Sequence, residues 1–341
     1  MPRQLDMHDV DVQRRKRKRR VQADSDSDAE GSRSAPAAKP RKKRPNHNRT
    51  SRSINEISDP ERRRIVKAGY RPIEKAVCLE NPWPIVSPSG DPAANDDEFE
   101  NLIDDAWDGG VDALGLDPDL FDAKDTTAVE RKLLRGRIPH VRSGIMKEAD
   151  RLVRESYGFI DIMSLKDCTA ENIQKIEEAN RQRVADLHGK FMYTDPEDTS
   201  DIATMCRHPI FQKLLIACFF APKGINRRGF FFDGKDMLPL ETLGLFMDAI
   251  ICGIDRWKTG RHTPIDFDAE TYGGSGHEAS MAFLKAWMAE YKAAVYPVNL
   301  AEACLREMLS NARKLCEIPS EEAPPRPSMF PMHVFSNTNS Q

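Results

Sequence analysis

Two clusters of Lys and Arg near the N-terminus are the residues whose type and spacing point most directly to a chemical role. Their members are Arg14, Arg15, Lys16, Arg17, Lys18, Arg19, Arg20, Lys39, Arg41, Lys42, Lys43 and Arg44. Cationic runs of this length are typical of nuclear-import signals, and the gap between the clusters suits a bipartite signal. They could also neutralise the phosphates of a nucleic acid, without sequence readout and with a steep dependence on salt. A solvated charged tail with neither role is the remaining alternative.

The segment between the clusters holds Ser25 and Ser27, each flanked by aspartates. Serines in such surroundings suit an acidophilic kinase, which makes these two residues candidate phosphorylation sites. A phosphate there would lower the positive charge of the tail and could tune import or binding. Serines also fall between acidic residues by chance in a polar tail, so both interpretations stay open.

A loop rich in Gly and Arg mixes cations with aromatic side chains. Its candidate contact residues are Arg227, Arg228, Phe230 and Phe231. Nucleic-acid and protein contact surfaces often combine these residue types. The alternative, in which the aromatic side chains anchor the loop onto neighbouring helices, is favoured.

The remaining candidates for chemistry are weak. The glycine-rich residues 272–278 precede a predicted helix and could hold an anion through backbone N–H groups, but the stretch meets neither nucleotide-binding fingerprint. His262 stands near Asp266 and Asp268, but no two histidines of the chain have the i, i+4 spacing that places two metal ligands on one helix face. We therefore predict no catalytic residue, no metal site and no cofactor.

The elements that must position these residues are helices, which begin near Glu130. Apolar residues recur at helical spacing, and no period-2 alternation of any length occurs. The predicted helices cover residues 143–158, 169–191, 209–219, 239–257, 278–296 and 300–315. The fourth is apolar nearly all round and should be the most buried. The sequence thus predicts an all-α domain, a compact bundle of about six helices.

Charge and composition divide the rest of the chain. Residues 1–65 form a predicted disordered basic tail, 66–129 a Pro-rich and then acidic linker, 130–318 the helical domain and 319–341 a disordered C-terminal tail. From residue 91 to 130 the chain has 14 Asp and Glu against one Lys. Spaced apolar side chains in this acidic stretch predict one weak amphipathic helix, or a segment that folds only against a partner.

The seven cysteines are scattered singly and contain no CxxC pair. This pattern is typical of free, buried thiols in a reducing compartment. No N-terminal apolar h-region and no run of 18 apolar residues occurs, so we expect an intracellular, soluble protein with no membrane partner. Together with the basic clusters, these features predict a location in the nucleus.

Several segments together resemble a known family. They are RIPHVRSGIMKEADRLVRESYGF, FMYTDPED, RHPIFQKLLIACFF and LPLETLGLFMDAIICGIDRWKTG, followed by Tyr272. In their order and spacing they are similar to a large basidiomycete fungal family catalogued only as a domain of unknown function, over about residues 130–317. The resemblance implies a helical fold and a fungal origin, and it implies no activity, cofactor or catalytic residue. Asp255-Arg256-Trp257 departs from the family, where an acidic pair is expected before the Trp.

The leading hypothesis is a non-enzymatic nuclear protein-interaction module. An import receptor would bind the basic clusters, and a protein partner of unknown identity would bind the helical domain. One alternative is a nucleic-acid-associated factor, linked to mobile elements, that binds non-specifically through the basic tail. A second alternative is an enzyme whose active site is assembled from residues far apart in the sequence.

Overall fold

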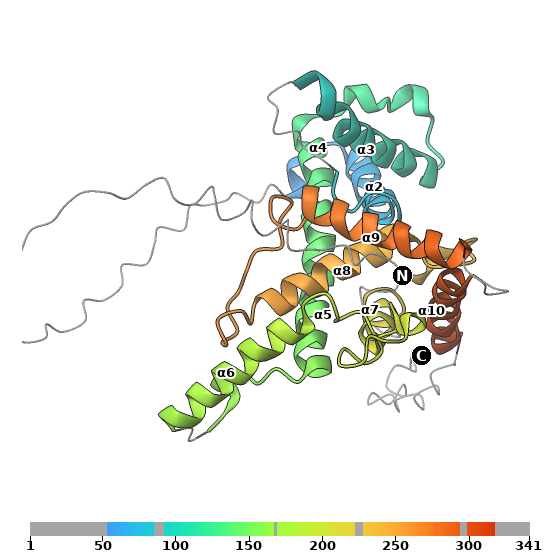
Figure 1. Ribbon diagram of the computed structural model, residues 1–341. Coiled ribbons are helices and arrows are strands. Elements are labelled where there is room, and N and C mark those ends of the chain that lie inside the picture. Colours follow the sequence, from blue (N-terminus) through green and yellow to red (C-terminus); the bar gives the residue numbers. More distant parts are fainter. Residues whose placement is uncertain (1–52, 85–91, 167–168, 222–227, 294–298, 318–341) are drawn as a thin grey trace, which may run out of the picture. The chain divides into compact units, whose positions relative to one another are not determined.

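The computed structural model describes residues 53–84, 92–166, 169–221, 228–293 and 299–317 (Figure 1). Within these ranges the chain is all-α and contains no strand, and one isolated β-bridge joins Tyr193 and Met205. The α-helices are α2 (Pro60–Leu79), α3 (Pro92–Ala113), α4 (Ala128–Arg135), α5 (Arg137–Tyr157), α6 (Ala170–Leu187), α7 (Pro209–Phe219), α8 (Leu240–Asp255), α9 (Gly274–Ala293) and α10 (Leu300–Glu317). The predicted all-α fold is confirmed.

The core of the helical domain is built around α5 and α8. Helix α5 packs against α8, α7, α2 and α4, and α8 packs in turn against α9. Nearly every side chain of α8 is buried, as its all-round apolar sequence predicts. Figure 1 shows α5 running between the N-terminal helices and the C-terminal ones. Helix α5 therefore connects the two halves of one hydrophobic core.

The N-terminal helices α2, α3 and α4 belong to this core, which corrects the predicted linker over residues 66–129. Buried apolar residues of this region include Ile65, Ile73, Trp83, Ile103 and Trp107. The tail was also predicted to reach residue 65, yet α2 begins at Pro60, after its N-cap Asp59. The predicted boundary near Glu130 lies too late, because the burial of these side chains offsets the weak helix signals of the segment.

Helix α2 continues through Pro72, where the sequence predicts an extended linker. A proline inside a helix removes one hydrogen bond and costs about 3 kcal/mol. Close packing against α3 offsets this cost, since the Pro72 ring lies against Gly109 and a Cβ at Gly110 would come within 2.6 Å of the Ile65 carbonyl. Glycines on α3 thus allow the two helices to approach closely.

Helix boundaries in the C-terminal part follow local caps. The Thr169 hydroxyl accepts a hydrogen bond from the Asn172 N–H and begins α6, as predicted. His208 and Pro209 begin α7, and Gly158 ends α5 in a left-handed conformation at φ 68°. Three predicted bounds are wrong by more than two residues. Helix α5 begins at Arg137, six residues before Ser143, because the helical chain resumes directly after Gly136, and α6 ends at Leu187 rather than at residue 191. Helix α9 begins at Gly274, within the glycine-rich residues 272–278, rather than at residue 278.

Helix α6 is the least buried of the long helices, and only Asn180 and Leu187 of its residues are buried. Polar contacts hold it in place. The Asn180 side-chain amide donates to the carbonyls of Ile160 and Gly260, and its oxygen accepts from the Ile160 N–H. Arg183 donates to the Gly158 carbonyl. In Figure 1, α6 extends away from its neighbours. We call α6 and the preceding residues 159–166 the α6 arm.

Five cysteines of the described part of the chain are free and buried. They are Cys78, Cys206, Cys218, Cys252 and Cys304. Burial raises the pKa of the Cys78 thiol to about 12 and that of Cys252 to about 11. The prediction of buried free thiols is confirmed for these positions, which pack as small hydrophobic side chains.

Candidate functional site

Many of the predicted functional residues lie outside the described residues. These are both basic clusters, Ser25, Ser27 and Arg227. Arg228, Phe230 and Phe231 of the predicted contact loop are described, on and beside the short 3₁₀ helix η6 (Gly229–Phe232). The predicted site residues that the structure describes therefore all lie in this loop.

The aromatic side chains of η6 divide between the core and the surface. Phe231 is buried, and so is Phe232, whose ring packs edge-on against Phe219. Phe230 is 36% exposed, and the Arg71 guanidinium of α2 lies 3.8 Å from its ring centroid. The anchoring role that the sequence favoured fits Phe231, whereas Phe230 faces outward in a cation–π contact.

A buried ionic cluster on the inner side of α2 fixes the loop to this helix. The carboxylate of Glu74, on the inner side of α2, pairs with Arg228 (Nε to Oε2, 3.0 Å) and with Arg137 of α5. Glu74 and Arg228 are both buried. A buried carboxylate with two guanidinium partners is well compensated, and removal of any one member would leave a desolvated charge. Arg228 is thus a structural residue and is not free to contact a partner.

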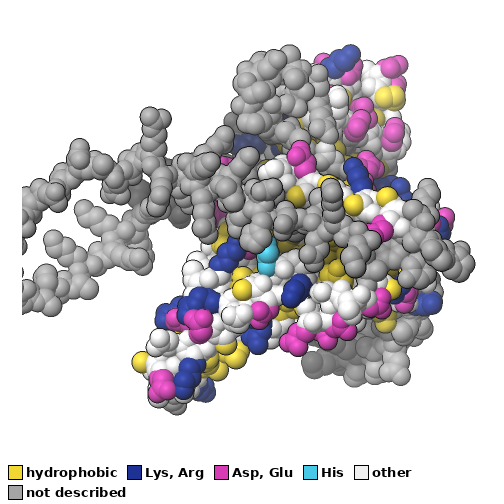
Figure 2. All heavy atoms as spheres, in the orientation of Figure 1, with side chains coloured by type: hydrophobic (Ala, Val, Ile, Leu, Met, Phe, Trp, Pro, Cys, Tyr) yellow, Lys and Arg dark blue, Asp and Glu magenta, His cyan; other side chains and the backbone are white. Residues whose placement is uncertain are grey.

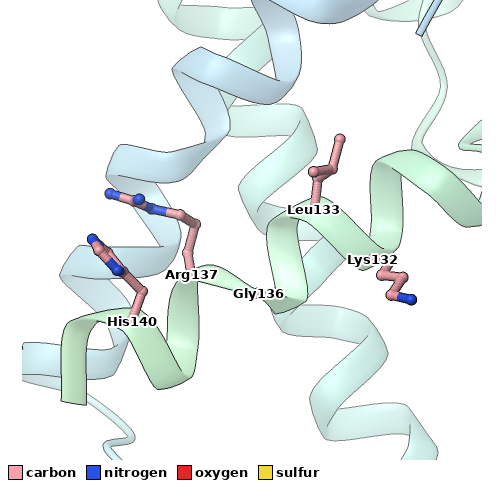
Figure 3. Close-up of a pocket in the computed structure, with 5 residues that line it drawn as sticks. All are labelled: Lys132, Leu133, Gly136, Arg137 and His140. Atoms are coloured by element: carbon pink, nitrogen blue, oxygen red, sulfur yellow. The ribbon is translucent and has the colours of Figure 1, made fainter. Parts of the chain in front are cut away.

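A shallow pocket of about 280 Å³ lies beside this cluster, where α4 meets α5. Figure 3 shows Arg137 and His140 extending to the same side, toward α2, while Lys132 points away from them. Partial burial and the charge of Arg137 lower the pKa of His140, and the Glu74 carboxylate opposes this shift. The pocket carries positive charge, and no nucleophile is paired with a base among its lining residues.

The outer side of α2 carries a row of cations that was not predicted from the sequence. Arg64, Lys67, Arg71 and Lys75 are all exposed, and their spacing of three or four residues places them on one face of the helix. We call these residues the α2 basic row. Within the described residues none of them has an ion-pair partner. The spacing was visible in the sequence, but it became significant only once α2 was seen to continue through Pro72.

A second surface feature lies on the α6 arm. Met163 is 90% exposed, and Ile160 and Leu165 each expose about two-fifths of their surface. We call these residues the apolar patch. Met163 lies within the 3₁₀ helix η4 (Ile162–Ser164), and Ile160 and Leu165 flank that helix. Figure 2 shows hydrophobic side chains at the surface of the α6 arm, between basic and acidic ones. The patch was missed in the sequence because its apolar residues lack helical spacing.

Another polar network surrounds Asp248 of α8, which is 2% exposed. Its carboxylate lies 2.6 Å from His277 Nδ1 and accepts from the Ser280 hydroxyl and the Trp83 indole. A carboxylate beside a histidine can orient an imidazole for catalysis. Here its other contacts join three chain segments, and this arrangement is typical of a satisfied core carboxylate.

The residues weighed for metal binding do not converge. His262 contacts Asp150 (Nε2 to Oδ1, 3.0 Å) instead of Asp266 or Asp268. In the described part of the chain there is no group of three or more His, Cys, Asp or Glu that could hold a metal ion. None of the helices in that part is both long and apolar enough to cross a bilayer.

The fold and these surfaces define an all-helical domain with a cationic face and an apolar patch. Its family is shown by a match to the model of a domain of unknown function, DUF6532, over residues 69–287. The match covers more than half of the chain, and the chain therefore belongs to this family. It begins within α2, which agrees with the inclusion of the N-terminal helices in the core. Comparisons with curated proteins and with solved structures found no match.

Proposed function

We propose that this protein is a non-enzymatic nuclear interaction module. In this proposal the helical domain binds a protein partner through the apolar patch, and the basic clusters of the N-terminal segment bind an import receptor. A basidiomycete origin, which the family resemblance implies, is part of the same proposal.

The observation that carries the proposal is the exposure of the apolar patch. Ile160, Met163 and Leu165 lie within six consecutive residues and are exposed together. Single exposed apolar residues are common on protein surfaces, whereas neighbouring ones often mark an interaction site. Methionine suits such a site because its flexible thioether adapts to different partners.

The α6 arm presents this patch on a fixed support. Hydrogen bonds of Asn180 to both backbone groups of Ile160 hold one end of the patch, and Arg183 holds the adjoining Gly158. Ile173 and Ile176 of α6 are only half-buried and lie outside the main core. A partner could cover these side chains as well, and binding would not first require the arm to become ordered.

Affinity purification with a charged substitution tests the proposal. The full-length wild-type chain and Met163→Lys are used to capture proteins from nuclear extract, and Leu120→Lys is the matched control because Leu120 is also a highly exposed apolar residue. We expect a defined set of proteins with the wild type and the control, and loss of that set with Met163→Lys. Equal capture by all three proteins would refute a role for the patch.

The import role is tested separately in cells. A fluorescent fusion that lacks residues 14–44 should lose nuclear accumulation, because both basic clusters are removed. A second deletion, over residues 319–341, controls for truncation. Nuclear accumulation that persists without residues 14–44 would rule out import by these clusters.

The second candidate is a nucleic-acid-associated factor, linked to mobile elements, that binds through the tail. It is favoured by the charge of residues 1–64, which hold 19 Lys and Arg against 10 Asp and Glu. Phosphate contacts by these cations would make binding to duplex DNA weaken steeply with salt. Full-length chain that fails to bind duplex DNA at low salt would exclude this candidate.

A further inference from the structure

We propose that the helical domain itself carries a nucleic-acid-binding surface, formed by the α2 basic row together with Phe230. This surface is distinct from the N-terminal clusters and from the apolar patch. It would contact the phosphodiester backbone of a single strand and stack a base at Arg71.

The arrangement of charge on α2 supports this inference. The four side chains of the row, from Arg64 to Lys75, lie along one helix face over 12 residues, a rise of about 16 Å. One strand of a B-form duplex, at about 3.4 Å of helix axis per phosphate, would present roughly five phosphates over this length, and a more extended single strand would present fewer. The row therefore matches a repeating anionic polymer better than a single small anion.

The acidic groups of the same helix do not neutralise the row. Glu74 lies between Arg71 and Lys75 in the sequence, but it is buried and pairs with Arg137 and Arg228. Glu61 and Glu80 are exposed near the ends of α2, outside the row. Inward placement of Glu74 leaves an uninterrupted cationic face toward solvent.

Helix α3 packs against α2, but the carboxylates of α3 form no described ion pair with the α2 basic row. Partial burial and the neighbouring carboxylates of Asp104, Asp105, Asp122 and Asp112 raise the pKa of Asp108. The described ion pairs of α3 are to α4, where Arg131 binds Glu100 and Asp104. The negative charges of α3 thus do not neutralise the positive charges of the α2 basic row.

The contact between Arg71 and Phe230 supplies a platform for a base. The guanidinium lies over the ring at 3.8 Å, and Arg71 is itself exposed. Unpaired bases stack on aromatic rings and on the planes of arginine side chains. Buried Phe231 and the Arg228–Glu74 ion pair fix the loop that carries Phe230, so the platform is preformed.

The platform also favours a nucleic acid over an anionic membrane surface. Stable membrane association of a cationic helix requires large apolar side chains that insert into the bilayer. Among the described residues, no large apolar side chain of α2 is exposed, and Arg71 already lies over the ring of Phe230. Vesicles of anionic lipid therefore serve as the competing probe.

The test measures binding of the full-length protein to a fluorescent 20-nucleotide oligo(dT) at several salt concentrations. Lys67→Gln/Lys75→Gln removes two phosphate contacts and should reduce the slope of log affinity against log salt by about 1.4. The matched control is Lys190→Gln/Lys213→Gln, which removes two exposed lysines that have no ion-pair partner among the described residues. Because the tail is intact in every variant, its contribution cancels in the comparison.

A second variant tests the platform. Arg71→Lys keeps the charge but loses the planar face, so the salt slope should stay unchanged while the affinity for oligo(dT) falls. An abasic oligonucleotide should bind the wild type and Arg71→Lys equally. The inference is overturned if Lys67→Gln/Lys75→Gln and the control have the same slope, or if the protein binds anionic vesicles and no oligonucleotide.

Discussion

The indole Nε1 of Trp83 donates a hydrogen bond to Oδ2 of Asp248 at 3.0 Å, and this contact joins the segment after α2 to the most buried helix, α8. The two residues are 165 positions apart in the chain. His277 and Ser280 of α9 contact the same carboxylate. One buried side chain thus ties the N-terminal helices to two helices of the C-terminal half.

Asp248→Ala should strongly destabilise the protein. The substitution leaves three buried or half-buried donors without their acceptor, and we expect the free energy of unfolding to fall by about 3 kcal/mol or more. Urea denaturation followed by circular dichroism measures the change. Asp233→Ala, at an exposed aspartate, is the control and should have little effect. Similar denaturation midpoints for the two variants would contradict a structural role for Asp248.

His208 should make the protein less stable in mild acid. Its ring stacks on Tyr157, and Nδ1 accepts from the Ile210 N–H at the start of α7. Burial and the charge of Lys213 lower its pKa from 6.5 to about 4, against a smaller opposing effect of Asp195. Because the unfolded chain binds the proton more tightly, stability is full above pH 6.5 and is lost as the pH falls toward 4.

Denaturation at pH 7 and pH 5 checks this prediction. His208→Asn, which retains a capping side chain, should lose less stability between these pH values than the wild type does. The exposed His188→Asn serves as the control and should behave like the wild type. If His208→Asn keeps the full pH dependence, another group is responsible.

Glu130 should add a separate loss of stability at lower pH. Its side chain is 1% exposed and binds Arg62 of α2 through both carboxylate oxygens, at 2.8 and 2.9 Å. Burial alone would raise its pKa, but hydrogen bonds from Arg62 and Thr127 lower the pKa below 4.5 overall. This contribution is present above pH 4.5 and is lost as the pH falls through the folded-state pKa.

Glu130→Gln should therefore flatten the pH dependence of unfolding below pH 4.5, while the slope between pH 6.5 and 5 stays as in the wild type. The variant itself should be less stable at pH 7, since Arg62 loses its charged partner. Glu61→Gln, at an exposed position on α2, is the control. An unchanged slope below pH 4.5 would show that the Arg62 contact does not shift the pKa.

Asn180→Ala should loosen the α6 arm. The variant leaves the carbonyls of Ile160 and Gly260 and the Ile160 N–H without a protein partner, and we expect a loss of about 2 kcal/mol. Hydrogen exchange should quicken in residues 158–162 and in α6. Asn172→Ala, at an exposed asparagine on the same helix, should leave exchange unchanged. Uniform acceleration across the whole domain would argue against a local role.

The sequence predicted the C-terminal helices well because local signals determine them. Thr169, Pro209 and Gly158 act as caps or helix ends where the pattern placed them. The N-terminal helices were predicted less well because their local signals conflict with the fold: residues 66–129 were predicted as a linker whose acidic stretch forms one weak amphipathic helix or folds only against a partner. Pro72 and the acidic residues of α3 disfavour a packed helix, and burial of residues such as Trp107 outweighs them.

The candidate surfaces were harder to predict than the helices. Arg71 and Phe230 are far apart in the chain, and no periodic pattern could pair them. Burial of Arg228 and Phe231 depends on Glu74 and on the packing of η6, which likewise come from distant segments. Only the α2 basic row is formed by residues close together in the sequence. Its spacing indicates a cationic face only when α2 is known to continue through Pro72.

The buried thiols give the protein a set of built-in chemical reporters. Alkylating reagents attack the thiolate, so an enclosed thiol whose pKa is about 12, as in Cys78, reacts only after the surrounding helices separate. The five buried cysteines lie on α2, α7, α8 and α10 and in the turn before α7. Mass spectrometry of modified peptides at increasing denaturant would therefore show which helices detach first, without any engineered label.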